Sequence, residues 1–240
     1  MTRMTNFVVA AWLLGCGVAQ AAGDIDQLQN IVQGQFRLLS EDVAAAFSYK
    51  PLAPATPLGL TGFDVGIALT GTALENEGIL EAVTSGDAPS MLLVPKVQVI
   101  KGLPLGIDIG GSYVGVPGTK IRLWGAEIRW AILDGGIATP AIGLRGSVTR
   151  LDGVDQLDFG TRAVDVAISK GLAMATPYAG VGRVWATSTP LNVPGLSEEK
   201  FSMTKVFAGV GLKFLLLNLD FEVDKTGDAK SYGAKIGVRF

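Results

Sequence analysis

From residue 58 onward, hydrophobic and polar residues alternate along the chain with a period of two. In residues 216–225 one face carries Leu217, Leu219, Phe221 and Val223, and the other carries Asn218, Asp220, Glu222 and Asp224. Successive side chains of a β-strand point to opposite faces, so this period predicts strands. We expect ten, at approximately 59–72, 91–101, 104–116, 119–132, 136–150, 157–170, 175–188, 201–214, 216–225 and 230–240.

The length and the two faces of these strands favour a barrel that crosses a membrane. At about ten to fourteen residues, the strands exceed the usual length in soluble sheets and match tilted membrane-spanning strands. One face is apolar, and the other mixes glycine with charges of both signs, as a narrow filled lumen requires. Alternation alone leaves a soluble barrel open, because that fold also has one apolar and one polar face. The hydrophobic fraction of 48% favours the membrane.

The predicted connections alternate in length. KGLP, LDGG, GLAMA and a tight turn near Leu215 follow the even-numbered strands, whereas generally longer segments follow the others, among them ALENEGILEAVTSGDAPS and STPLNVPGLSEEK. Outer-membrane barrels have short periplasmic turns and longer outer loops. We therefore expect residues 58–240 to form an all-β, antiparallel up-and-down transmembrane β-barrel, with both termini on the periplasmic side.

Residues 1–21 predict a cleaved secretory signal peptide. Arg3 precedes an apolar run at 7–14, and Ala19 and Ala21 form a small-x-small cleavage pattern. Cys16, the only cysteine, is either an ordinary signal residue or the acylated residue of a lipoprotein box. The signal predicts an exported protein, which we expect in the bacterial outer membrane.

Residues 22–57 predict a short helical segment followed by a proline-rich linker. Apolar residues between Asp24 and Phe47 recur near the helical period, and the three prolines at 51, 54 and 57 then prevent a continued helix. We expect this segment either to plug the lumen or to lie at its periplasmic mouth. In the first long connection, residues 79–83 predict either a short amphipathic helix or a small packing cluster.

These features together resemble those of bacterial outer-membrane β-barrel proteins. The chain ends in a strand with apolar or aromatic residues at alternate positions, namely Tyr232, Ile236, Val238 and Phe240. In that class the terminal strand is recognised by the barrel-assembly machinery, so the resemblance implies this role for these four residues. It also implies outer-membrane lipid as the surrounding partner.

A shorter similarity concerns the stretch from Asp42 through Phe47 to Pro51. It is similar to the N-terminal Asp…Phe…Asn-Pro-Ala stretch of long-chain fatty-acid transporters, whose N-terminus plugs the barrel. Here Lys50 replaces the asparagine, the spacing to the proline is one residue longer, and the chain is far shorter than those transporters.

Charged residues on the predicted inner faces form the candidate site. They are Asp64, Lys96, Asp108, Glu127, Arg129, Arg145, Arg183, Lys205, Lys213, Asp220, Glu222, Asp224, Lys235 and Arg239. They either line a water path or bind a polar ligand, or they pair and close the lumen, which their near balance of sign favours. In the strand at 157–170, Arg162 and Asp165 have opposite parity, which predicts a bulge or a shifted register.

The sequence excludes several kinds of chemistry. It has no histidine, and its only cysteine lies in the predicted signal, which excludes histidine-based and thiol catalysis and Cys/His metal sites. Asp152, Asp155 and Asp158 either supply calcium ligands or form a turn, which the Asp-Gly pair favours. The net charge of −2 gives no basic tract for nucleic acid. We therefore predict no enzyme activity, no cofactor and no nucleic-acid partner.

The sequence favours a narrow channel or transporter for small or hydrophobic compounds. One alternative is a structural or adhesive barrel without transport. Another is a soluble periplasmic barrel that binds an apolar ligand.

Overall fold

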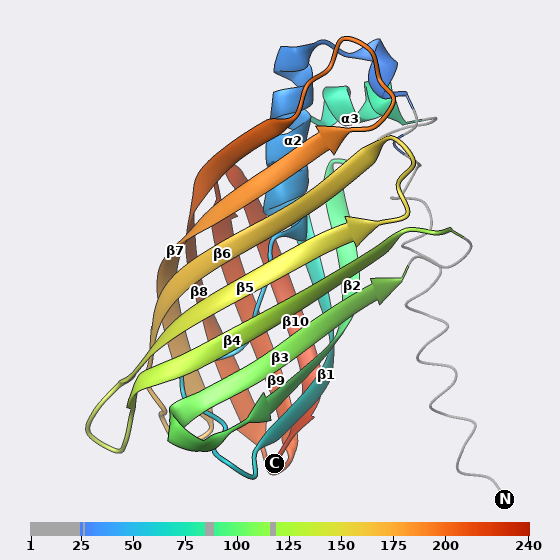
Figure 1. The fold of residues 1–240 in the computed structure, drawn as a ribbon. Coiled ribbons are helices and arrows are strands. Elements are labelled where there is room, and N and C mark those ends of the chain that lie inside the picture. The colour runs from blue at the N-terminus through green and yellow to red at the C-terminus, as the bar shows by residue number, and fades with distance from the viewer. Residues whose placement is uncertain (1–24, 26, 85–88, 116–118) are drawn as a thin grey trace, which may run out of the picture.

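The computed structural model describes residues 25, 27–84, 89–115 and 119–240, and it contains a closed barrel of ten antiparallel strands (Figure 1). The predicted signal and its cleavage positions, Ala19 and Ala21, lie outside the described residues. The strands are β1 (Phe63–Ala73), β2 (Met91–Gly102), β3 (Ile107–Gly115), β4 (Arg122–Asp134), β5 (Ala141–Asp152), β6 (Leu157–Ser169), β7 (Ala175–Pro190), β8 (Glu199–Phe214), β9 (Leu217–Thr226) and β10 (Ala229–Arg239). Each strand pairs with its neighbours in sequence, and β10 closes on β1. The prediction of an up-and-down barrel is confirmed.

The register of the pairing corrects one detail of the sequence prediction. A shift interrupts the pairing of β4 with β5 between Ala131 and Leu133. The irregularity predicted for residues 157–170 is wrong, because β6 pairs with β5 and β7 without a shift. Arg162 and Asp165 have opposite parity for a simpler reason: Arg162 is exposed on the outer surface, and Asp165 is buried in the lumen.

The connections divide the barrel into two different ends. The links β2–β3, which contains η2 (Pro104–Gly106), β4–β5, β6–β7 and β8–β9 lie at the same end as Phe240, which we call the short-turn end (Figure 1). The other links lie at the opposite, long-loop end. The β1–β2 link contains α3 (Glu77–Val83), a short helix that buries Leu80 and Val83.

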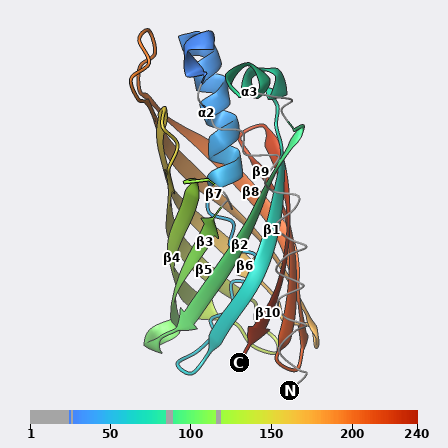
Figure 2. The ribbon, with the colours of Figure 1, turned by 90° about the vertical axis from the view of Figure 1, so that its right-hand side faces the viewer.

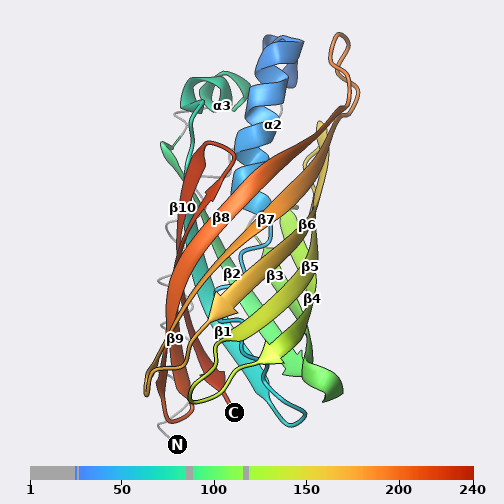
Figure 3. The same ribbon diagram turned by 90° about the vertical axis from the view of Figure 1, so that its left-hand side faces the viewer.

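The N-terminal segment enters the barrel from the long-loop end. Both η1 (Leu28–Asn30) and α2 (Gln33–Phe47) lie at this end, and the chain then descends inside the barrel to β1 (Figures 2 and 3). Helix α2 ends at Phe47 because Ser48 is already extended, with ψ 149°, and the first of three prolines follows at Pro51. We call residues 48–58, which run through the lumen, the plug.

Residues 48–58 occupy the lumen, which is one of the two positions expected for the N-terminal segment, and α2 lies at the long-loop end (Figure 2). The helix lies at the end opposite Phe240, the end at which the barrel strands begin and finish (Figure 2). Residues 48–62 are long enough to allow this, because fifteen extended residues span up to about 50 Å. The first described residues and Phe240 therefore lie at opposite ends of the molecule.

Candidate functional site in the barrel lumen

Most of the charged residues predicted to line the lumen are buried or half-buried inside the barrel. These are Asp64, Lys96, Asp108, Glu127, Arg129, Arg145, Lys205, Asp220, Glu222, Asp224, Lys235 and Arg239. Arg183 is an exception, since it is exposed and bonds to Ser202 and Thr204 on the outer surface. Its parity, which it shares with Val181 and Trp185, could have revealed this. Lys213 is exposed beside the cavity at the short-turn end.

One group of ion pairs lies beside the seam where β10 closes on β1. Lys235 of β10 contacts both Asp64 of β1, at 3.0 Å, and Asp220 of β9, at 3.1 Å. Arg239 of β10 contacts the same two carboxylates. The first and last strands are thus joined by buried charge pairs in addition to their backbone hydrogen bonds.

A second group of charges lies across β4, β5 and β6. The Arg145 Nε atom donates to Asp165 at 3.0 Å and lies 3.9 Å from a Glu127 oxygen. Glu222 accepts a hydrogen bond from the Tyr178 hydroxyl at 3.1 Å. Both carboxylate oxygens of Glu127 and one of Glu222 accept no hydrogen bond from the described residues. Such buried oxygens require water as a partner, so this part of the lumen is suited to hydration.

The plug is held by side chains of the barrel wall. Lys50, which the sequence analysis did not include among the lumen charges, pairs with Asp224 at 2.7 Å and donates to Ser231 at 3.1 Å. Four wall side chains donate to plug carbonyl oxygens: Lys205 to Tyr49, Lys96 to Lys50, Gln98 to Pro51 and Arg129 to Pro54. The wall lysines therefore bind the plug backbone instead of neutralising Glu127 and Glu222 by direct contact.

Two cavities lie at opposite ends of the plug. At the short-turn end a cavity of about 390 Å³ is lined by Pro54, Ser169, Lys213 and Arg239, among others. At the long-loop end a smaller cavity of about 70 Å³ is lined mainly by apolar side chains, among them Leu39, Val43, Phe47, Leu74 and Leu151. A polar cavity and an apolar cavity are thus separated by residues 48–54.

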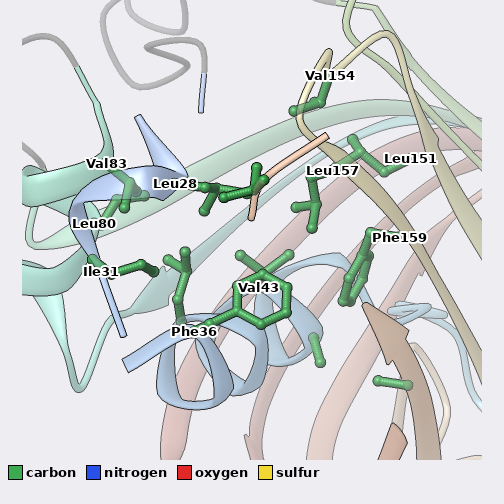
Figure 4. Close-up of a cluster of buried hydrophobic side chains, with 14 of the residues drawn as sticks. Leu28, Ile31, Phe36, Val43, Leu80, Val83, Leu151, Val154, Leu157 and Phe159 are labelled. Atoms are coloured by element: carbon green, nitrogen blue, oxygen red, sulfur yellow. The ribbon is translucent and has the colours of Figure 1, made fainter. Parts of the chain in front are cut away.

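A hydrophobic cluster packs α2 against the long-loop end (Figure 4). Leu28, Phe36 and Val43 from the N-terminal segment meet Val83 of α3 and Phe159 of β6, all of them buried. Asp42 of α2 accepts hydrogen bonds from the backbone N–H groups of residues 75 and 76, and burial raises the pKa of its carboxyl group. The helix is therefore packed against the first long loop by both apolar and polar contacts.

The polarity of the barrel is the reverse of that of a soluble barrel. Its outer surface exposes apolar side chains such as Ile67, Val166 and Phe221, each 46% exposed, while charged side chains fill the interior. Apolar surface of this extent on all strands is stable only in lipid, because the hydrophobic effect would otherwise bury it. The fold is that of a small outer-membrane β-barrel. The soluble apolar-ligand barrel is therefore the wrong alternative.

Comparisons with known proteins find similar solved structures but no relative by sequence. No protein-family model and no curated protein matches the sequence. The N-terminal β-barrel domain of Pseudomonas aeruginosa OprF is similar in structure, with 13% identity and a TM-score of 0.40 over 76% of this chain and 99% of that one. The Escherichia coli outer-membrane protease OmpT is similar with 10% identity and a TM-score of 0.38, over 75% of this chain and 95% of that one. The translocator domain of autotransporter NalP from Neisseria meningitidis is similar with 10% identity and a TM-score of 0.37, over 87% of this chain and 94% of that one.

The residues of the implied assembly signal all lie on the outer face of the last strand. Tyr232, Ile236 and Val238 are exposed there, and the Phe240 ring stacks on Phe63 with 6.0 Å between centroids. Phe240 also exchanges two backbone hydrogen bonds with Phe63. The end of the chain thus completes the barrel seam at the short-turn end.

The structure also places the candidate calcium ligands. Arg150 pairs with Asp152 at 3.4 Å and with Asp158 at 3.2 Å, and Gly153 forms the turn between them with φ +84°. In the described ranges, no group of three or more His, Cys, Asp or Glu side chains is placed to hold a metal ion. None of the described helices is long and apolar enough to cross a membrane.

Proposed function

We propose that this protein is a non-enzymatic outer-membrane channel or transporter of narrow bore, kept closed by its own plug. The observation that supports the proposal is the set of polar contacts between the plug and the barrel wall. Lys50 and four plug carbonyl oxygens contact polar wall side chains. Polar side chains that bind an extended peptide can bind water instead when the peptide shifts. The export signal, the barrel-assembly machinery and the outer-membrane location belong to the same proposal.

The two cavities support the choice of a small or hydrophobic solute. A solute from the long-loop end meets the apolar cavity of about 70 Å³ beside α2 first. It then passes the plug and reaches the polar cavity of about 390 Å³, which opens at the short-turn end. A large polar solute fits neither the volume nor the apolar lining of the first cavity.

The plug can be locked to the wall by an engineered disulfide. A Cβ atom built on Gly143 of β5 lies 3.5 Å from the Ala55 Cβ atom, within the range for a disulfide bond. We therefore expect Ala55→Cys with Gly143→Cys, in a Cys16→Ser background, to form a reducible cross-link. The two single cysteine variants are the matched controls.

Conductance in planar bilayers tests the proposal. We expect channel openings from the wild type and the single variants, fewer openings from the oxidised double variant, and recovery after reduction. Deletion of residues 24–57 should give a larger and steadier current, provided that heat-modifiable gel mobility shows a folded barrel. If folded wild-type and deleted proteins pass neither ions nor small solutes into liposomes, the protein is a structural barrel and the channel proposal is wrong.

A further inference from the structure

The outer surface carries a group of basic residues at the long-loop end. Arg150 of β5, Arg162 of β6, Arg183 of β7 and Lys200 of β8 all point outward and are exposed. These four strands lie side by side in the barrel wall, with β5, β6 and β7 at the front of Figure 1. We call these four side chains the basic surface.

Two members of the basic surface have no acidic partner in the part of the chain that the structure describes. Arg150 and Lys200 are paired with acids, since Arg150 contacts Asp152 and Asp158, and Lys200 contacts Glu198 at 2.5 Å. Arg162, by contrast, has no hydrogen-bond or ion-pair partner among the described residues. Arg183 bonds to the hydroxyl groups of Ser202 and Thr204, and no described acid pairs with it.

Two lysines at the short-turn end have hydrogen-bond partners within the protein. Lys170 donates to the backbone carbonyl groups of residues 136, 137 and 139. Lys101 donates to those of residues 60 and 62. The protein itself therefore satisfies these two lysines. Among the described residues, the outward arginines that lack a partner of opposite charge lie toward the long-loop end.

The strand register makes the basic surface a shaped site. A groove of about 690 Å³ crosses this surface. Its lining includes Trp124, Trp185 and the cations Arg150, Arg162 and Lys200, together with Asp158 and Glu198, the acids that pair with Arg150 and Lys200. Arg150 is paired with Gly160, and Thr187 with Lys200, so the small residues Gly160 and Thr187 lie between the two cations. Arg150 and Lys200 are three strands apart, or roughly 14 Å. The groove thus holds a cation on each side and Arg162 below.

The height of Arg162 places it at the boundary of the hydrocarbon layer. Below it on the outer face of β6 lie Val164, Val166 and Ile168, and Lys170 follows them directly after the strand. The eight residues from Arg162 to Lys170 span roughly 20 Å of height at a tilt of about 40°, close to the apolar band of about 25 Å in an outer-membrane barrel. Arg162 and Trp185 therefore lie where lipid headgroups begin.

We propose that the basic surface binds the phosphorylated headgroup of a lipid in the leaflet at the long-loop end. Guanidinium groups match phosphate oxygens in geometry and charge, and Trp124 and Trp185 suit the junction of headgroup and acyl chain. The acyl chains then lie against the apolar outer face of β6 and β7. This proposal rests on the membrane barrel and is independent of channel activity.

The proposal can be tested by titration with two probes. One is lipid A with two phosphates, and the other is the same lipid with its phosphates removed. We expect detergent-solubilised full-length protein to bind the phosphorylated form more tightly, with affinity that falls as salt rises. Arg162→Gln with Arg183→Gln should weaken binding by roughly tenfold or more, since each loses charge-assisted hydrogen bonds. The control is Lys101→Gln with Lys170→Gln, which removes two cations at the other end.

Every outcome of this titration bears on the proposal. Unchanged affinity in the arginine variant, equal loss in the control variant, or equal binding of the dephosphorylated lipid would overturn it. Displacement by inorganic phosphate at equal concentration would show an anion site that does not need a lipid. Heat-modifiable mobility of both variants shows that the barrel is folded, and native mass spectrometry of the bound lipid gives a second readout.

Discussion

Lys50 is the only charged residue in the sequence between 48 and 62, and its side chain is buried against Asp224. Both side chains are only 3% exposed. Removal of one partner of a buried ion pair strongly destabilises a protein, because the other charge stays buried without a partner. Replacement of both partners by uncharged side chains of similar size does not. The contact therefore stabilises one position of the plug relative to the wall.

Substitution of Lys50 tests this contact at the scale of one residue. Lys50→Ala should destabilise the folded barrel by about 3 kcal/mol, because Asp224 loses its ion pair in the lumen. The measurement is the temperature at which the folded band disappears on a gel. Lys225→Ala is the matched control, since Lys225 follows Asp224 but pairs with the exposed Asp228 on the outer surface.

A compensating change distinguishes a lost pair from general damage. Lys50→Met combined with Asp224→Asn removes both charges, so it should recover most of the lost stability. Channel openings should remain more frequent than in the wild type, because the plug is still not held at that point. A double variant as unstable as Lys50→Ala would contradict this account.

At the scale of elements, β10 closes the barrel by pairing with β1. Deletion of Phe240, or Phe240→Asp, should lower the yield of assembled, heat-modifiable protein, because the ring stacks on Phe63 and its backbone closes the seam. Phe214→Asp is the control, since Phe214 is also an exposed aromatic residue at the short-turn end. Equal assembly of Phe240→Asp and wild type would leave β10 without a special role in assembly.

The strands could be predicted from the sequence because their alternation reports local geometry directly. Residues 216–225 show this, since the alternate acids at 220, 222 and 224 all face the lumen. The direction of the plug could not be predicted, because its prolines and helical pattern fit either mouth of the barrel equally well. Lys50 meets Asp224 across 174 positions of sequence, and no local pattern marks such a contact.

Arg183 and Arg162 show that a charged residue in a barrel strand does not always face the lumen. Charged residues in a membrane strand are expected in the lumen, and this expectation places Arg183 there against its own parity. The rule fails at Arg162 and Arg183, which lie within β6 and β7 and point outward. Parity read without regard to charge would have placed Arg162, Arg183 and Asp165 where the structure has them.

At the scale of the whole molecule, the first described residues and Phe240 lie at opposite ends (Figure 3). With the long loops outside the cell, Gly34→Cys should react with a membrane-impermeant maleimide on intact cells, because a Cβ atom there meets no other atom within 4 Å. Ile137→Cys is the control, since residue 137 is fully exposed in a short-turn link and should react only after lysis. The opposite labelling pattern would show that the barrel is inserted the other way round.

The threaded path of the chain also limits how far the lumen can open. Residues 48–58 are tethered to α2 above and to β1 below, so they cannot swing out of the lumen at either end. For these residues to leave the lumen, α2, which is about 10 Å wide, would have to unfold or to pass through the barrel. Every open state in which α2 stays folded at the long-loop end therefore keeps a segment of peptide in the pore, and solutes pass beside it.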